Sequence, residues 1–187
     1  MKNPYLYGYL PLFSVILFSL TFGIYLVGES LDVLTSIGVY AGMREFLTDF
    51  ELRLLLLIVF ALCFFMLFAA LKLIGETIHE VGMLFFSKDN SGEMISVARG
   101  GNLIFFGGAL LSIFGIESLP ILLCIFILTI FAYFIYNIYK MSQFLTTPGM
   151  IGLIVFEILF WAIFATLIGY VVLKLYNGVL ASLPFAN

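Results

Sequence analysis

Long, nearly uncharged apolar runs limit what this chain can fold into more than any other feature. An α-helix needs about 20 apolar residues to cross roughly 30 Å of hydrocarbon. Runs close to that length occupy residues 7–27, 54–74, 100–116, 119–139 and 150–173. We therefore expect an all-α fold, a polytopic membrane helical bundle of about five transmembrane helices, which forms a single integral membrane domain over residues 1–187.

The number of crossings depends on the third run, which is marginally short. Glu117-Ser118-Leu119-Pro120 follows it, and a charge and a proline within four residues suit a tight helical hairpin turn. Four crossings, one of them broken, are the alternative. Residues 29–53 place apolar side chains close to helical spacing, with breaks expected at Gly38 and Gly42. This outer segment is predicted to be amphipathic and to lie on the membrane surface, although a re-entrant hairpin is equally allowed.

Lysine and arginine predict the orientation, because positive charge near a span resists translocation. An N-terminus inside the cell keeps five of the eight Lys and Arg residues inside. The five inside are Lys2, Lys72, Lys88, Arg99 and Lys140; the three outside are Arg44, Arg53 and Lys174. We expect a multi-pass protein of the bacterial cytoplasmic membrane, surrounded by lipid, with its N-terminus inside.

The composition excludes several classes of function. Only 10% of the residues are charged, against roughly 25% in an average soluble domain. The few basic residues are spread along the chain, so nucleic acid is not an expected partner. The sequence lacks the nucleophile elbow, the zinc-protease and P-loop motifs and any Cys-x-x-Cys pair. We therefore expect no enzymatic activity, no catalytic residue, no metal and no cofactor.

Glu157 is the most informative single residue, because it lies two turns inside the fifth run, about 10 Å from its inner end. A charge at a helix centre costs about 2.5–3.5 kcal/mol on insertion scales, so the carboxyl group should face the protein interior and be paired or protonated. Lys72 and Arg99 are its predicted partners, since both end their spans on the inner side. A fixed structural pair or a neutral, hydrogen-bonded acid is favoured over a proton or cation relay.

A charged cluster marks the end of the second run, where Glu76, His79 and Glu80 share a helix face with Lys72. A solvated helix end stabilised by ion pairs is the favoured interpretation, and a pH-sensing role for His79 is the alternative. Glu76-x-x-His79 is also half of a pattern that binds two irons in helical bundles. Because the chain has one histidine, such a site could form only across a symmetric dimer.

Small residues recur along the third run. Gly101, Gly108 and Gly115 are seven residues apart, and Ser112 lies on nearly the same face. Small side chains let membrane helices approach closely, so we expect a helix-packing face, within the chain or between two copies. A substrate cavity is the less favoured use of this face.

Four stretches carry a resemblance to a known family. They are Met1–Leu6, Val39–Phe46, Phe68–Ile74 and Lys174–Asn177. Together they resemble the YufK-like small membrane proteins of Bacillus-type bacteria. The resemblance implies a cytoplasmic membrane protein over the whole chain, and it implies no activity and no catalytic residues.

The function expected from these observations is that of an accessory or scaffold protein. The glycine face and the lack of chemical motifs favour a chain that binds another membrane protein or a second copy of itself. A small solute or ion transporter is the alternative, proton-linked through Glu157. A substrate-binding subunit of an uptake complex would combine the two roles.

Overall fold

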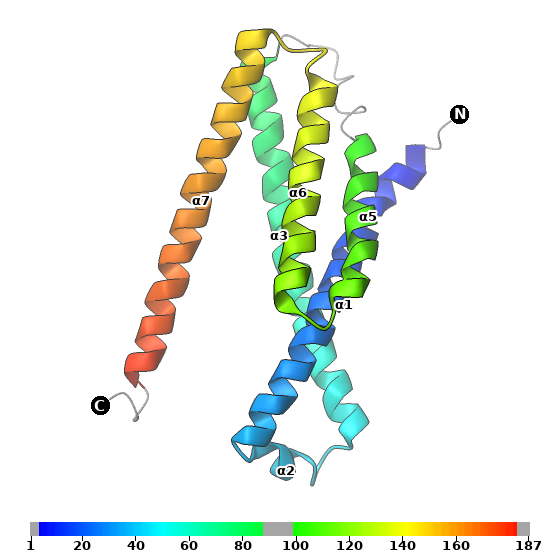
Figure 1. Ribbon diagram of the computed structural model, residues 1–187, viewed down its shortest axis with the longest axis vertical. Helices are drawn as coiled ribbons and strands as arrows, with labels where there is room; N and C mark the ends of the chain where they lie inside the picture. Colours follow the sequence, from blue (N-terminus) through cyan, green and yellow to red (C-terminus); the bar gives the residue numbers. More distant parts are fainter. Residues whose placement is uncertain (1–3, 88–98, 183–187) are drawn as a thin grey trace. The chain divides into compact units, whose positions relative to one another are not determined.

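The computed structural model describes residues 4–87 and 99–182, and every regular element within these ranges is a helix (Figure 1). The elements are α1 (Pro4–Ser36), α2 (Val39–Met43), α3 (Asp49–Phe86), η1 (Arg99–Gly101), α5 (Asn102–Leu111), η2 (Ser112–Gly115), α6 (Leu119–Met141) and α7 (Thr147–Ser182). The prediction of an all-α membrane protein is confirmed.

Four helices, α1, α3, α6 and α7, are long and apolar enough to cross a membrane. The third predicted run forms a shorter apolar helix, with 10 residues in α5 and four in η2. At 1.5 Å per residue an α-helix of this length reaches about 21 Å, which is less than the hydrocarbon thickness of roughly 30 Å. Ser118 then adopts an extended conformation, and Pro120 lies in the first turn of α6, as the predicted hairpin requires.

The long helices extend well beyond the predicted runs. α1 has 33 residues, α3 has 38 and α7 has 36. An apolar run marks where side chains leave water, whereas a helix continues for as long as its residues tolerate helical dihedrals. For this reason α3 passes through the charged cluster at Glu76–Glu80 and ends only at Phe86.

The outer segment divides between three elements. α1 continues to Ser36, Gly38 takes a left-handed φ of 76°, and α2 follows directly. The expected break is therefore right at Gly38, where the turn requires a conformation that glycine adopts freely. It is wrong at Gly42, which lies inside α2 because glycine permits a break without imposing one.

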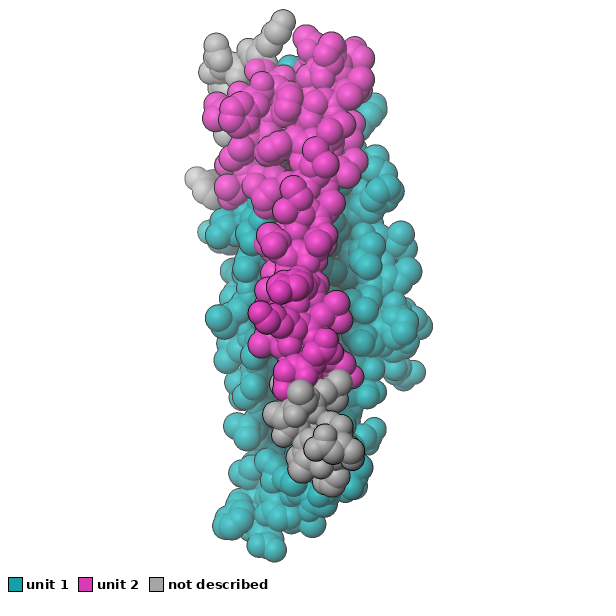
Figure 2. Space-filling model, turned by 90° about the vertical axis from the view of Figure 1, so that its left-hand side faces the viewer, with its two compact units in different colours: residues 1–75, 89–144 teal, residues 76–88, 145–187 magenta. Residues whose placement is uncertain are grey.

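The chain forms two compact units, coloured separately in Figure 2, and each is described by itself. Unit 1 contains residues 1–75 and 89–144, and unit 2 contains residues 76–88 and 145–187. α3 therefore contributes to both units, with the change after Gly75.

A phenylalanine cluster fills the core of unit 1. Phe18 of α1 is fully buried, with ring centroids 6.1 Å from Phe68 of α3, 5.8 Å from Phe105 of α5 and 5.1 Å from Phe126 of α6. All three contacts are edge-on, the geometry that the charge distribution of aromatic rings favours. One residue thus links four helices.

A neutral hydrogen bond and a close backbone approach also hold the helices of unit 1 together. The buried hydroxyls of Thr21 and Ser112 lie 3.0 Å apart and join α1 to η2. At Gly23 of α1 a Cβ atom would lie 3.2 Å from the backbone nitrogen of Ala61 in α3. In lipid there is no hydrophobic driving force between apolar helices. Close packing and interhelical hydrogen bonds of this kind therefore hold membrane helices together.

Candidate functional site

An ionisable pair lies inside unit 2. Nδ1 of His79, on α3, is hydrogen-bonded directly to Oε1 of Glu157, on α7. Glu157 is only 4% exposed and the His79 side chain is 14% exposed. His79 is the one histidine of the chain, and Glu157 is the one charged residue of α7 before Lys174.

Two antiparallel helices position this pair. Three contacts show the opposite directions of the two helices: Phe86 lies against Gly149 and Gly152, Gly82 against Leu153, and His79 against Glu157. The residue numbers fall along α3 while they rise along α7. The start of α7 is defined by Thr146, whose Oγ1 accepts a hydrogen bond of 3.3 Å from the Gly149 N–H. From that start, Glu157 lies nearly three turns along the helix, about 15 Å.

Glycines allow the close approach on which the pair depends. A Cβ atom at Gly149 would lie 2.7 Å from the carbonyl oxygen of Phe86, and one at Gly152 would lie 2.5 Å from the Phe86 ring. These residues were not among the predicted site residues. The Gly149-x-x-Gly152 spacing at the beginning of the fifth run was the sequence signal that could have indicated them.

Both members of the pair are side chains of a type that can bind a proton. Histidine is the side chain that changes its charge between about pH 5 and 8, and a desolvated carboxylate is unfavourable unless it is paired. A protonated His79 forms a salt bridge with Glu157, whereas a neutral imidazole leaves the carboxylate charge uncompensated. The other ionisable side chains on this part of α3 are Glu76 and Glu80, and both are exposed.

Neither predicted partner of Glu157, Lys72 or Arg99, is described in contact with it. Lys72 belongs to unit 1, where its Nζ is 3.4 Å from Oδ1 of Asn102 and 5.5 Å from the ring centroids of both Phe105 and Tyr133. Arg99 begins η1, and its side chain is not among those described. Within residues 4–87 and 99–182, no three His, Cys, Asp or Glu side chains gather as a metal site would require.

The predicted glycine face lies inside unit 1. Gly101 faces Tyr133 and Asn137, Gly108 faces Thr129, and Gly115 faces Ile121, all on α6. Ser112 is directed instead toward α1, where it meets Thr21. A Cβ atom at Gly101 would approach the Tyr133 ring to 2.7 Å. These small residues therefore serve helix packing within the unit.

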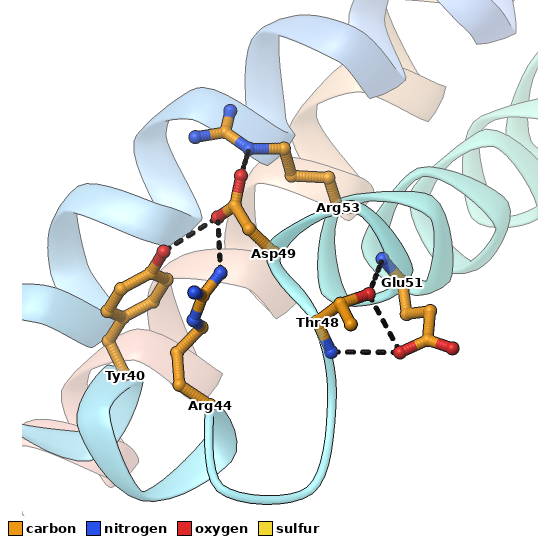
Figure 3. Close-up of polar contacts among 6 residues, drawn as sticks. All are labelled: Tyr40, Arg44, Thr48, Asp49, Glu51 and Arg53. Atoms are coloured by element: carbon orange, nitrogen blue, oxygen red, sulfur yellow. Dashed lines mark hydrogen bonds and ion pairs between the residues drawn. The ribbon is translucent and has the colours of Figure 1, made fainter.

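A second polar cluster surrounds Asp49 at the start of α3 (Figure 3). The Tyr40 hydroxyl donates a 2.6 Å hydrogen bond to Asp49, Arg53 donates one of 2.8 Å, and Arg44 lies 3.7 Å away. This first turn precedes the apolar run of α3. The hydrogen bond to Asp49 raises the pKa of Tyr40, and the hydrogen bonds from Tyr40 and Arg53 lower the pKa of Asp49. Because these side chains are well exposed, the cluster contributes little stability.

A capping box fixes the same helix end. The Glu51 carboxylate accepts hydrogen bonds of 2.8 Å from both the N–H and the hydroxyl of Thr48, and the Glu51 N–H donates one of 3.3 Å to Thr48 Oγ1. The two residues satisfy each other's unpaired groups at the helix start. The Thr48-x-x-Glu51 pattern is a sequence signature of a helix start, and the prediction for residues 29–53 did not take it into account.

An aromatic cluster follows Glu157 along α7. The ring centroid of Trp161 lies 5.8 Å from that of Phe160 and 5.6 Å from that of Phe164. Trp161 is four residues after Glu157, one turn further along the same helix face.

Comparisons with known proteins cover nearly the whole chain. Residues 27–184, which include both members of the pair, match a family model described as a family of unknown function, DUF5366. Over 184 residues the chain is 38% identical to "Uncharacterized membrane protein YufK" of Bacillus subtilis (strain 168), an alignment that covers 98% of this chain and 100% of that protein. No solved structure matches the chain.

Proposed function

This chain belongs to the DUF5366 family, and we propose that it is a proton-responsive accessory protein of the bacterial cytoplasmic membrane. The observation that supports this proposal most directly is the hydrogen bond between His79 and Glu157, where α3 contacts α7. An ionisable residue within a membrane helix is a functional candidate by default, because its desolvation is unfavourable. His79 and Glu157 are two such residues, and they are paired with each other.

The position of the pair supports a sensor rather than a relay. It lies within three turns of the end of α3 at Phe86 and of the start of α7 at Thr147. From residue 158 to residue 173, α7 has no charged residue and no histidine that could pass a proton further. With the N-terminus inside, both helix ends face the cytoplasm, so the pair would respond to cytoplasmic pH.

The accessory role is supported by the surface of α7. Only 11% of the residues in the most apolar stretch of α7 are buried, compared with 50% in the most apolar stretch of α1. An apolar helix with this much free surface can contact lipid or another membrane protein. Protonation of His79 would strengthen the α3–α7 contact and deprotonation would weaken it, which gives a partner two arrangements to distinguish.

The test is the α3–α7 distance as a function of pH. Spin labels at positions 84 and 158, both exposed and both in unit 2, are introduced after Cys63 and Cys124 are replaced by alanine. In liposomes we expect the distance measured by electron paramagnetic resonance to lengthen as pH rises from about 5 to 8. His79→Gln should remove the response, and Glu80→Gln, which changes an exposed acid of the same helix, should preserve it.

Two results would decide against the proposal. A distance that is independent of pH, or a response that persists in His79→Gln, means that the pair is a fixed structural contact. Proton flux into the liposomes that requires Glu157 would replace the accessory role with proton-linked transport.

A further inference from the structure

A polar cluster in unit 1 is not used by the proposed proton switch. It lies where the apolar run of α3 ends, where α5 begins and in the last turns of α6. Lys72 contacts Asn102 and lies over the rings of Phe105 and Tyr133. Two aromatic faces therefore hold the ammonium group of Lys72 near the start of α5.

Asn137 of α6 is the unusual member of this cluster. It is 3% exposed, and its Oδ1 is the buried side-chain oxygen that has no hydrogen-bond partner among the described residues. This oxygen is directed at the start of α5, since a Cβ atom at Gly101 would lie 2.9 Å from it. Buried polar atoms in folded proteins nearly always have a partner, so this oxygen indicates a hydrogen-bond donor that is not among the described side chains.

The start of α5 supplies the complementary property. α5 has 10 residues and continues directly from η1 through a helical Gly101. The N–H groups at the start of this joined segment, in η1, therefore have no acceptor within the segment and carry a partial positive charge. Such an end favours phosphate groups, and Lys72 adds a full positive charge beside it. The cluster thus combines a site for an anion with an acceptor for a hydroxyl group.

We propose that this cluster binds a phosphate-bearing group that also carries a hydroxyl. The phosphate is held by the Lys72 ammonium group and the start of α5, and the hydroxyl donates to Asn137 Oδ1. The headgroup of phosphatidylglycerol and soluble glycerol 3-phosphate share this chemistry. Lys72 lies near the end of the apolar run of α3, and Lys140 lies in the last turn of α6. Lipid headgroups lie at the corresponding ends of membrane helices.

The experiment is native mass spectrometry of the full-length chain in detergent, titrated with phosphatidylglycerol, phosphatidylcholine or glycerol 3-phosphate. We expect phosphatidylglycerol to bind more tightly than phosphatidylcholine, which has the phosphate without the hydroxyl. Lys72→Gln and Asn137→Leu should each weaken phosphatidylglycerol binding by about tenfold, the effect of losing one hydrogen bond to a charged or desolvated group. Lys140→Gln is the matched control, since its ammonium group lies over Tyr136 instead.

Each outcome decides the proposal. Loss of phosphatidylglycerol binding in both variants but not in Lys140→Gln supports a lipid site. The same loss for glycerol 3-phosphate, without lipid preference, supports the site with a soluble ligand. Equal binding by the wild type and both variants, or an equal loss in Lys140→Gln, overturns it. Lys72 is half-buried, so Lys72→Gln remains decisive if Asn137→Leu does not fold. Because the cluster is in unit 1 and the His79–Glu157 pair is in unit 2, the two proposals fail independently.

Discussion

The two units hold their helices together by different means. Unit 1 packs four helices around Phe18 and joins α1 to η2 through the neutral Thr21–Ser112 hydrogen bond. Unit 2 brings together α7 and the last turns of α3 by close contacts at glycines and by one ionisable pair. Both units need specific contacts between their helices, because lipid does not drive apolar helices together.

The difference lies in what each contact responds to. The aromatic packing of unit 1 contains no group that titrates near neutral pH, so the Phe18 contacts should be insensitive to pH. The contact in unit 2 has less apolar packing and includes His79. We therefore expect pH to affect the helix contact of unit 2 and to leave the aromatic core of unit 1 unchanged.

Separating the pair should have the largest effect. His79→Leu leaves the buried Glu157 carboxylate without its partner, and breaking a buried pair costs about 3–5 kcal/mol. Hydrogen exchange should show α7 losing its protection. The double variant His79→Leu/Glu157→Leu should recover most of it, because no charge is then left unpaired. If the single and double variants are equally unprotected, His79 contributes packing rather than charge pairing.

Truncation of the aromatic core should have a somewhat smaller effect that does not depend on pH. Phe18→Ala removes contacts with three rings and should lower the free energy of unfolding by about 3 kcal/mol, measured by thermal unfolding in detergent. Phe13→Ala, at a 57% exposed position of the same helix, is the control and should change it little. A loss of stability in Phe18→Ala that varies with pH would break the contrast between the units.

The smallest expected effect concerns the glycine contact. Gly149→Ala places a methyl group against the Phe86 carbonyl oxygen and should destabilise the α3–α7 contact by about 1–2 kcal/mol. Gly169→Ala is the same change on α7 with no atom within 4 Å, and it should be neutral or stabilising, since alanine favours helix. Hydrogen exchange of α7 compares the two variants. Equal effects would mean that the contact at Gly149 is loose.

Much of the fold could be predicted from the sequence. Apolar runs located every long helix, and the glycine spacing pointed to the residues that lie against α6. The partner of Glu157 could not be predicted, because the second span was expected to end at residue 74. That placed His79 in water, whereas α3 continues to Phe86. No local pattern connects two residues that are 78 positions apart.

The position of Trp161 gives the protein an optical property. It is the one tryptophan of the chain, and it lies one helical turn beyond Glu157. Indole emission depends on the polarity of its surroundings, so the intrinsic fluorescence of the unlabelled protein comes from a position next to the buried carboxylate. The native sequence thus contains a spectroscopic reporter of its own site, which can be followed in membranes without labels or substitutions.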